Sequence, residues 1–276
     1  MTALSWDDLG HKFYETGTSH GVLFVMNTDG SYRNGVAWSG LTAVSESPSG
    51  AEETALYADD IKYLSLRSAE EFGATIEAYT YPDEWAVCDG SAELDTGIYI
   101  GQQTRRGFAF SYVTKVGNDI QGNDYGEKLH IIYNAMASPS EKSYATINDS
   151  PEAITFSWEI TTTPITFRSD LKPSATLTID KNKCDANVYQ AILERLYGTA
   201  SAESTLPEPD WILSQLEAAS SATYEAVSTS LTGYSDKSPK AEGWYEKTGS
   251  NPDTYVRSQD TVVDISTTYY KRAASA

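Results

Sequence analysis

The chain has 276 residues, of which 40% are hydrophobic and 12% aromatic, enough for one sizeable core with a small appendage or for two modest domains. Its 39 acidic and 20 basic residues give a net charge of −19, which argues against nucleic-acid binding through neutralised phosphates. No apolar run approaches the ~20 residues of a membrane-spanning helix.

The N-terminal part of the chain predicts two strands. The first residues, MTALSWDDLGHKF, lack the basic-then-apolar layout of a signal peptide, so we expect synthesis and folding in a cytoplasm. Residues 21–26 (GVLFVM) form an apolar run closed by the turn-like NTDGS, as in a strand that enters a hairpin. Residues 35–44 (GVAWSGLTAV) follow as a second strand, with Gly40 as a candidate bulge.

Residues 45–66, SESPSGAEETALYADDIKYLSL, form a connection far longer than a compact domain needs. Loops beyond about 12–15 residues are uncommon and are usually functional or disordered. This segment contains too many apolar groups for a disordered tether, namely Ala51, Ala55, Leu56, Tyr57, Ile61 and Leu64. Its apolar content raises the question of which surface it is buried against.

Five later segments predict further strands: 72–82, 106–115, 127–135, 153–162 and 174–180. The clearest alternation is in AITFSWEITT (153–162), where apolar and polar side chains point to opposite faces, as in a half-buried antiparallel strand. Strands of this kind separated by turns predict a mainly β fold, an antiparallel β-sandwich or barrel.

One helix is predicted within the β pattern. Asp185 is the predicted N-cap and Gly198 the predicted residue just beyond the C-terminus, with Val188, Ile192 and Leu196 as an apolar stripe between them. We expect this helix to flank the sheet.

The composition changes after this helix. Residues 199–232 are rich in Ser, Ala and Thr, with a short helix predicted over 209–219, and residues 243–272 contain aromatic strand-like pieces around a turn. We therefore expect a β domain over residues 1–200, with the long connection at 45–66, and a bridge with a small aromatic appendage over 201–276.

No motif of enzyme chemistry is present: the sequence has no GxSxG, P-loop, HExxH or DxDxDG pattern. The two cysteines, Cys88 and Cys184, are expected to be reduced in a cytosolic setting. The three histidines have no cysteine or acidic partner at zinc-site spacing. Glu77 and Glu159 could be read as the carboxylate pair of a glycosidase. Glutamates at exposed strand positions are, however, commoner in ordinary solvated sheets. We expect no enzyme, no cofactor and no metal.

An alternative function is a binding module. Tyr79, Tyr81 and Trp85 lie close in sequence and could stack on a sugar, although a role in the core or an interface is the commoner one for aromatic residues. On this alternative the chain is a β-sandwich displayed on a virion or cell surface that binds a carbohydrate or receptor.

With the segments in order, the sequence resembles the major tail tube proteins of long, non-contractile-tailed bacteriophages (siphophages). The resemblance runs from about Thr16 to Gly198. It rests on GVLFV, on NGVAWSGLTAVSESPSGAEETALYADDIKYL, on SAEEFGATIEAYTYPDEW and on IGQQTRRGFAFSYVT, and it continues through GNDYGEKLHIIYNA and SPEAITFSWEITTTP to the ERLYG helix.

The resemblance implies a β-sandwich or barrel of the tail tube type with one flanking helix, self-assembled into hexameric rings that stack into a tube. In this family the tube carries the genome into the bacterial host. The implied partners are other copies of the chain, a tape measure protein inside the tube, and tail terminator and distal tail proteins at its ends. Linear DNA passes through without specific binding, and the virion tail is assembled in the host cytoplasm.

The resemblance also gives roles to two groups of residues. The long connection is expected to reach other subunits, burying Leu56, Tyr57, Ile61 and Leu64 there. The acidity has two explanations, solubility alone or a surface past which DNA moves without being held. On the second, Glu77 and Glu159 are the candidate lumen-facing acids.

Overall fold

The computed structural model describes residues 4–147, 149, 153–220, 224–227, 244–250, 253–257, 263–264 and 267–272. The chain folds into two compact units, one made of residues 1–182 and 193–207 and the other of residues 183–192 and 208–276. The chain is mainly β and the strand pairings of both units are antiparallel, as the sequence predicts. None of the helices in the described ranges is long and apolar enough to cross a membrane.

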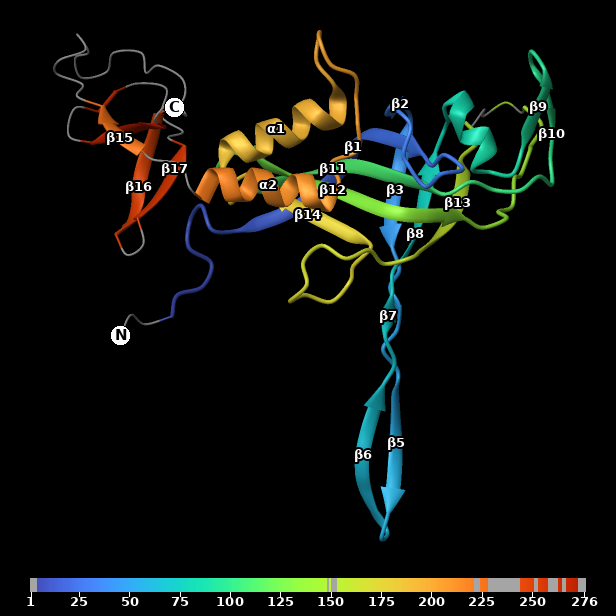
Figure 1. The fold of residues 1–276 in the computed structure, drawn as a ribbon, viewed down its shortest axis with the longest axis horizontal. Coiled ribbons are helices and arrows are strands. Elements are labelled where there is room, and N and C mark those ends of the chain that lie inside the picture. The colour runs from blue at the N-terminus through green and yellow to red at the C-terminus, as the bar shows by residue number, and fades with distance from the viewer. Residues whose placement is uncertain are drawn as a thin grey trace. The chain divides into compact units, whose positions relative to one another are not determined.

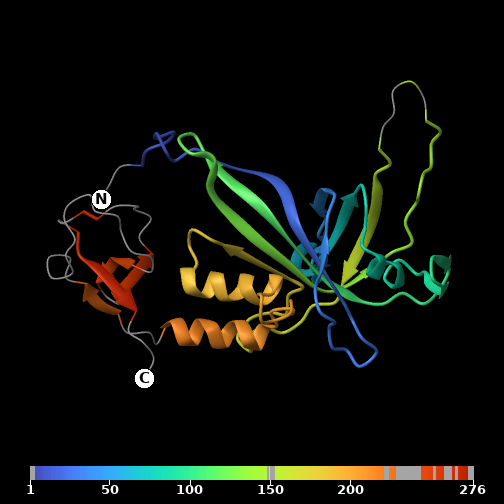
Figure 2. The same ribbon diagram turned by 90° about the horizontal axis from the view of Figure 1, so that it is seen from above.

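An eight-stranded sheet forms the first unit (Figures 1 and 2). Its path is β2-β1-β11-β12-β13-β8-β3, and β14 also pairs with β12. The strands are β1 (Phe13–Val25), β2 (Val36–Trp38), β3 (Leu41–Glu46), β8 (Gly73–Ala78), β11 (Phe108–Asn118), β12 (Gly122–Ala137), β13 (Phe156–Thr162) and β14 (Thr176–Asp180).

The two ends of this path meet at a corner. Strands β2 and β3 stand at opposite ends of the path, yet only Ser39 and Gly40 separate them in sequence. Gly40 has φ 81° and its carbonyl accepts a hydrogen bond of 2.9 Å from the Tyr79 amide. A side chain there would require a left-handed backbone and would approach Thr80 Cγ2 to 2.8 Å. The single strand expected over 35–44 is therefore wrong: Gly40 is a corner between two strands, not a bulge within one.

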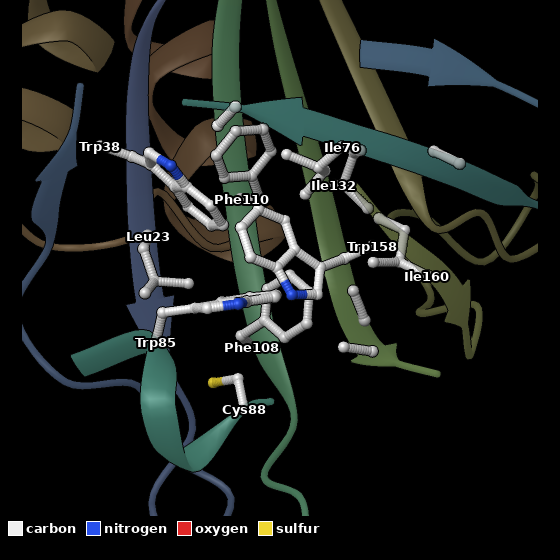
Figure 3. Packing of buried hydrophobic residues seen from close by; sticks show 14 of the residues in the cluster. Leu23, Trp38, Ile76, Trp85, Cys88, Phe108, Phe110, Ile132, Trp158 and Ile160 are labelled. Atoms are coloured by element: carbon white, nitrogen blue, oxygen red, sulfur yellow. The ribbon is translucent and has the colours of Figure 1, made fainter. Parts of the chain in front are cut away.

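Aromatic rings fill the space that the curled sheet encloses (Figure 3). The ring centroid of Trp38 lies 4.7 Å from that of Trp85 and 5.5 Å from that of Trp158, so strands β2 and β13 face each other across the core. Trp85 enters from a short 3₁₀ helix, η1 (Asp83–Val87). The alternation predicted for 153–162 is confirmed, since Trp158 and Ile160 are fully buried and Glu159 is exposed.

One edge of strand β12 pairs with β11, and the other edge pairs with two strands in turn because the backbone changes direction at Asn134. Residues before Asn134 pair with β14 and residues after it pair with β13. Asn134 has φ 48°, a left-handed conformation that asparagine tolerates better than most residues. Its side-chain amide donates to the Thr163 carbonyl at 3.3 Å, which stabilises the bend.

Helix α1 (Ala186–Tyr197) has the ends that the sequence predicts. The Asp185 carboxylate accepts hydrogen bonds from the amides of Asn187 and Val188 at 2.9 and 3.1 Å, and Gly198 has φ 77°. The apolar stripe of Val188, Ile192 and Leu196 is buried. The predicted N-cap, C-terminal glycine and stripe are confirmed.

Besides the first part of α1, the second unit contains a helix and a four-stranded sheet. Its elements are α2 (Pro209–Ser220), β15 (Tyr224–Val227), β16 (Trp244–Ser250), β17 (Asp253–Arg257) and β18 (Tyr269–Arg272), with the strands in the order β15-β18-β16-β17. Trp244, Val263 and Tyr269 form its buried cluster. The predicted helix and aromatic strands are present, but strand β15 lies in the bridge for which the sequence predicted none. Parts of the bridge and appendage lie outside the described residues.

Replacing Trp158 by Ala should lower the free energy of unfolding by about 3–5 kcal/mol, because the cavity is left among rigid rings. Urea denaturation followed by near-UV circular dichroism would measure it. The exposed neighbour Glu159→Ala is the matched control and should change stability by no more than about 0.5 kcal/mol. Equal effects at the two positions would contradict this description of the core.

Candidate functional site: a projecting hairpin arm

The most distinctive feature of the first unit is a hairpin that leaves the sheet between β3 and β8, here called the arm (residues 47–72; Figure 1). It contains β4 (Ser49–Gly50), β5 (Glu53–Ala58), β6 (Ile61–Arg67) and β7 (Glu70–Glu71). The sequence predicted a long loop over residues 45–66, whereas most of this segment forms one antiparallel ribbon.

Backbone hydrogen bonds run along the arm from its root to its tip. The Ser47 amide donates to the Gly73 carbonyl at 2.8 Å, and the Ala51 amide donates to the Ala69 carbonyl at 3.3 Å. Strands β5 and β6 then pair up to Ala58 and Ile61. At 3.3 Å per residue, the twelve or so residues of each strand give a reach of about 40 Å.

The tip of the arm is a two-residue turn made by Asp59 and Asp60. Both have left-handed backbones, with φ of 49° and 62°. This is the signature of a type I′ turn, whose twist matches that of the flanking strands. The turn places two consecutive carboxylates at the far end of the arm.

The arm has one apolar and one polar face, because residues paired directly across a hairpin share a face. The register pairs Leu56 with Leu64 and Glu53 with Arg67, and Tyr63 is the extra residue of a bulge. The apolar face consists of Thr54, Leu56, Ala58, Ile61, Leu64 and Leu66. The polar face consists of Glu53, Ala55, Tyr57, Lys62, Ser65 and Arg67.

The polar face is internally paired. Glu53 accepts from Lys62 Nζ and, at 2.5 Å, from Ser65 Oγ, and its carboxylate lies 3.8 Å from Arg67. The hydrogen bond from Lys62, with a further one from Ser65, lowers the pKa of Glu53. These groups hold the two strands in register on the side where water can solvate them.

The apolar face is open to solvent in the single chain. Leu56 is 42% exposed, Ile61 64% and Leu66 55%. The structure thus brings Leu56, Ile61 and Leu64 together on one surface and places Tyr57 on the other face. Sequence reasoning missed Leu66, which the period of two from Leu64 would have indicated.

The root of the arm is held by a polar cluster. Glu46, the last residue of β3, accepts a hydrogen bond of 2.8 Å from the Tyr112 hydroxyl, and its carboxylate lies 3.9 Å from His130 Nδ1. The His130 ring stacks on Tyr112 at 4.7 Å, and its Nε2 lies 2.9 Å from the Thr114 hydroxyl. Burial, with a further contribution from Glu46, raises the pKa of Tyr112, and burial lowers that of His130.

The two candidate acids share a face of the sheet. Glu77 lies opposite Ser157, and Glu159 lies opposite Thr75, on adjacent strands β8 and β13. This face is the reverse of the one on which Trp158 packs, and Glu159 is exposed on it. The structure brings the two residues together without assigning them a role.

The three aromatic residues of the binding-module alternative are not brought together on the surface. Trp85 is fully buried in the core, and Tyr81 packs edge-on against Trp158 at 5.4 Å. Only Tyr79 is largely exposed, at 54%. A stacking platform made of all three residues is therefore excluded.

Metal-ligating side chains do not gather in the part of the chain that the structure describes: no group of three or more His, Cys, Asp or Glu residues is placed to hold an ion. Neither Cys88 nor Cys184 forms a disulfide, and burial raises the pKa of Cys88 to about 12.

Neither a protein-family model nor a curated protein matches this chain. Among solved structures, it is similar to a chain in the six-fold symmetrised cryo-EM structure of the anti-feeding prophage baseplate, with 9% sequence identity and a TM-score of 0.29. The match covers 64% of this chain and 97% of that chain. A likeness at this level assigns no function.

Replacing Tyr112 by Phe should loosen the root of the arm, because it removes the hydrogen bond to Glu46. We expect a loss of about 1 kcal/mol in the free energy of unfolding and faster amide exchange at Ser47. The exposed Tyr144→Phe is the control. Unchanged exchange at the root in the Tyr112 variant would show that the cluster does not hold the arm.

Proposed function

We propose that this chain is a structural, non-enzymatic virion protein of a long, non-contractile phage tail. On this proposal six copies form a ring, and rings stack into the tail tube through which the genome enters the host. The ordered sequence resemblance from Thr16 to Gly198 supports it. The observation that carries it is the solvent-exposed apolar face of the arm.

Contacts within its own chain contribute little stabilising free energy to the arm. A two-stranded hairpin is marginal by itself in water, and each fully buried Leu or Ile side chain contributes about 1.5–3 kcal/mol. Leu56, Ile61, Leu64 and Leu66 are 38–64% exposed, so part of that free energy is not realised in the single chain. A second protein surface recovers it, and the proposal takes that surface from another copy.

An arm that projects from one region and docks on a different region of the next copy makes a heterologous contact. Such contacts propagate as filaments unless a partner ends them. The tail terminator and distal tail proteins would end the tube, and a tape measure protein inside would set its length.

Open sheet edges support joining within a ring. In the described part of the chain, β14 pairs only with β12, and β2 covers only Gly21 to Leu23 of the outer edge of β1. Exposed edges of this kind invite pairing with another chain. Joining β1 of one copy to β14 of the next would close the edges around the ring.

The acidic composition fits a conduit for DNA. A cation in the lumen would bind phosphate and gain free energy from released counterions, which would retard the polymer. Glu77 and Glu159 remain the candidate lining acids, since they share a sheet face.

Negative-stain microscopy of the purified chain tests the proposal. Rings or hollow tubes about a hundred ångströms wide, the order of size of six such domains in a ring, are the expected result. A monomer or small closed oligomer with saturable sugar binding would overturn it in favour of a binding module.

Replacing both Leu56 and Leu64 by Ser should abolish tube formation and leave the thermal unfolding of the single chain within about 2 °C, because neither side chain packs in its own core. Sedimentation would measure assembly. The control is Ala55→Ser, which alters the polar face of the same strands outside the Glu53 cluster and should still assemble. If the Leu56 and Leu64 variant assembles as well as the unmodified chain, the apolar face is not the contact.

Replacing both Glu77 and Glu159 by Lys should leave tubes intact by microscopy and reduce the rate of DNA release from assembled particles by about tenfold or more, since each lysine adds a phosphate contact. Release can be followed with a DNA-binding dye after triggering by receptor. Unchanged release would show that these residues do not line the channel.

A further inference from the structure

We infer that the tip of the arm places the Asp59 and Asp60 carboxylates in an arginine-bearing cleft on the first unit of a second copy. This inference rests on the proposed self-assembly and names the surface that receives the arm. It follows from the geometry of the cleft, the free charge within it and the charge at the tip.

The cleft lies where three loops of the first unit meet. Its volume is about 550 Å³, within the range of about 300–1,000 Å³ typical of ligand-binding clefts. Its lining is mixed: Met26 and Val87 are apolar, whereas Gln103, Arg105 and Arg106 are polar or charged. A site of this kind suits a ligand that combines apolar and anionic groups.

The two arginines of the cleft differ in their partners. Arg105 Nη1 lies 3.5 Å from the Asp89 carboxylate and donates to the Ala137 and Ser138 carbonyls at 3.4 Å. Asp89 has an 8% exposed side chain and is also bound by Lys142, so its charge is already neutralised. Arg106 has no hydrogen-bonded or ion-paired partner for its guanidinium among the described residues, and it is the charge that the cleft leaves available.

A free cation in this setting is informative because the chain as a whole is strongly acidic, with a net charge of −19. Two copies repel each other at long range, so a stable contact needs a local meeting of opposite charges. A carboxylate accepts two parallel hydrogen bonds from a guanidinium, which makes it a fitting partner for Arg106.

The arm's tip carries the matching groups. Asp59 and Asp60 stand at the end of the ribbon, about 40 Å from its root at 3.3 Å per residue. The exposed side chains of Tyr57 and Ile61 flank them and can pack on Met26 and Val87.

The placement of the arm makes the recipient a different copy. The cleft includes Ser91 and Ala92 at the start of a second hairpin, β9 (Ala92–Asp95) with β10 (Ile98–Ile100). Figure 1 shows this hairpin on the side of the sheet away from the arm's tip. An arm that extends away from its own cleft presents its carboxylates to the cleft of the next copy in a row.

The test uses three variants of the full chain. Asp59→Asn with Asp60→Gly removes both tip charges while giving the turn its most favoured sequence. Arg106→Glu reverses the charge at that position of the cleft. The third variant combines Arg106→Glu with Asp59→Lys and Asp60→Lys. The matched control for Arg106→Glu is Lys172→Glu, which makes the same net charge change at an exposed position.

The critical concentration for assembly, measured by sedimentation, should rise about tenfold or more in the tip-neutral and Arg106→Glu variants. It should return to within about threefold of the unmodified value in the combined variant, because the reversed charges pair again. The control should match the unmodified chain. Circular dichroism confirms that each variant is folded.

The outcomes separate the two claims. If the unmodified chain does not assemble, the proposed function fails, and this inference fails with it. If the unmodified chain assembles and the tip-neutral and Arg106→Glu variants assemble equally well, only the inference is overturned. The inference is likewise overturned if the combined variant is folded but assembles as weakly as Arg106→Glu alone.

Discussion

The pairing of β3 with β8 is the interaction on which the rest of the first unit depends. On one side it completes the sheet around the aromatic core, with β3 meeting β2 at the Gly40 corner. On the other side the same two strands continue outward as the arm. The arm is thus an extension of the sheet and inherits its register. Glu46, at the junction, joins the extension to Tyr112 on β11.

This continuity explains how an apolar surface can be exposed and still well ordered. The ladder and the Glu53 cluster on the polar face hold the strands in place, so that the opposite face presents its leucines and Ile61 in a fixed array. A preformed array loses less conformational entropy on docking than a flexible loop would. In the proposed assembly the tip adds charge to that array, so apolar burial and ion pairing would act at different points of one contact.

The sequence predicted the mainly β fold, helix α1 with both its ends, and the alternation in β13, because each depends on local periodicity or capping. The length and apolar content of residues 45–66 marked this segment as unusual, but the sequence did not predict that its two halves pair as a hairpin. The bulge at Tyr63 shifts the alternation, and Ala55 and Tyr57 place apolar side chains on the otherwise polar face.

The Gly40 corner was missed because apolar residues on both sides of it hide a change of partner strand. The arginine-bearing cleft had no sequence signal, since its lining comes from separate loops. Trp85 and Tyr79 look equivalent in sequence, and only the tertiary fold buries one and exposes the other.

The way β8 is fixed in the sheet also decides how the arm responds to mechanical force. A pull along the arm acts parallel to β8, whose hydrogen bonds to β13 run across the strand direction between Gly73–Thr161 and Ala78–Phe156. These bonds share the load in shear and must break together, whereas a sideways pull would open them one after another. A contact that loads the arm along its own length would therefore resist force far better than one that pulls the arm sideways.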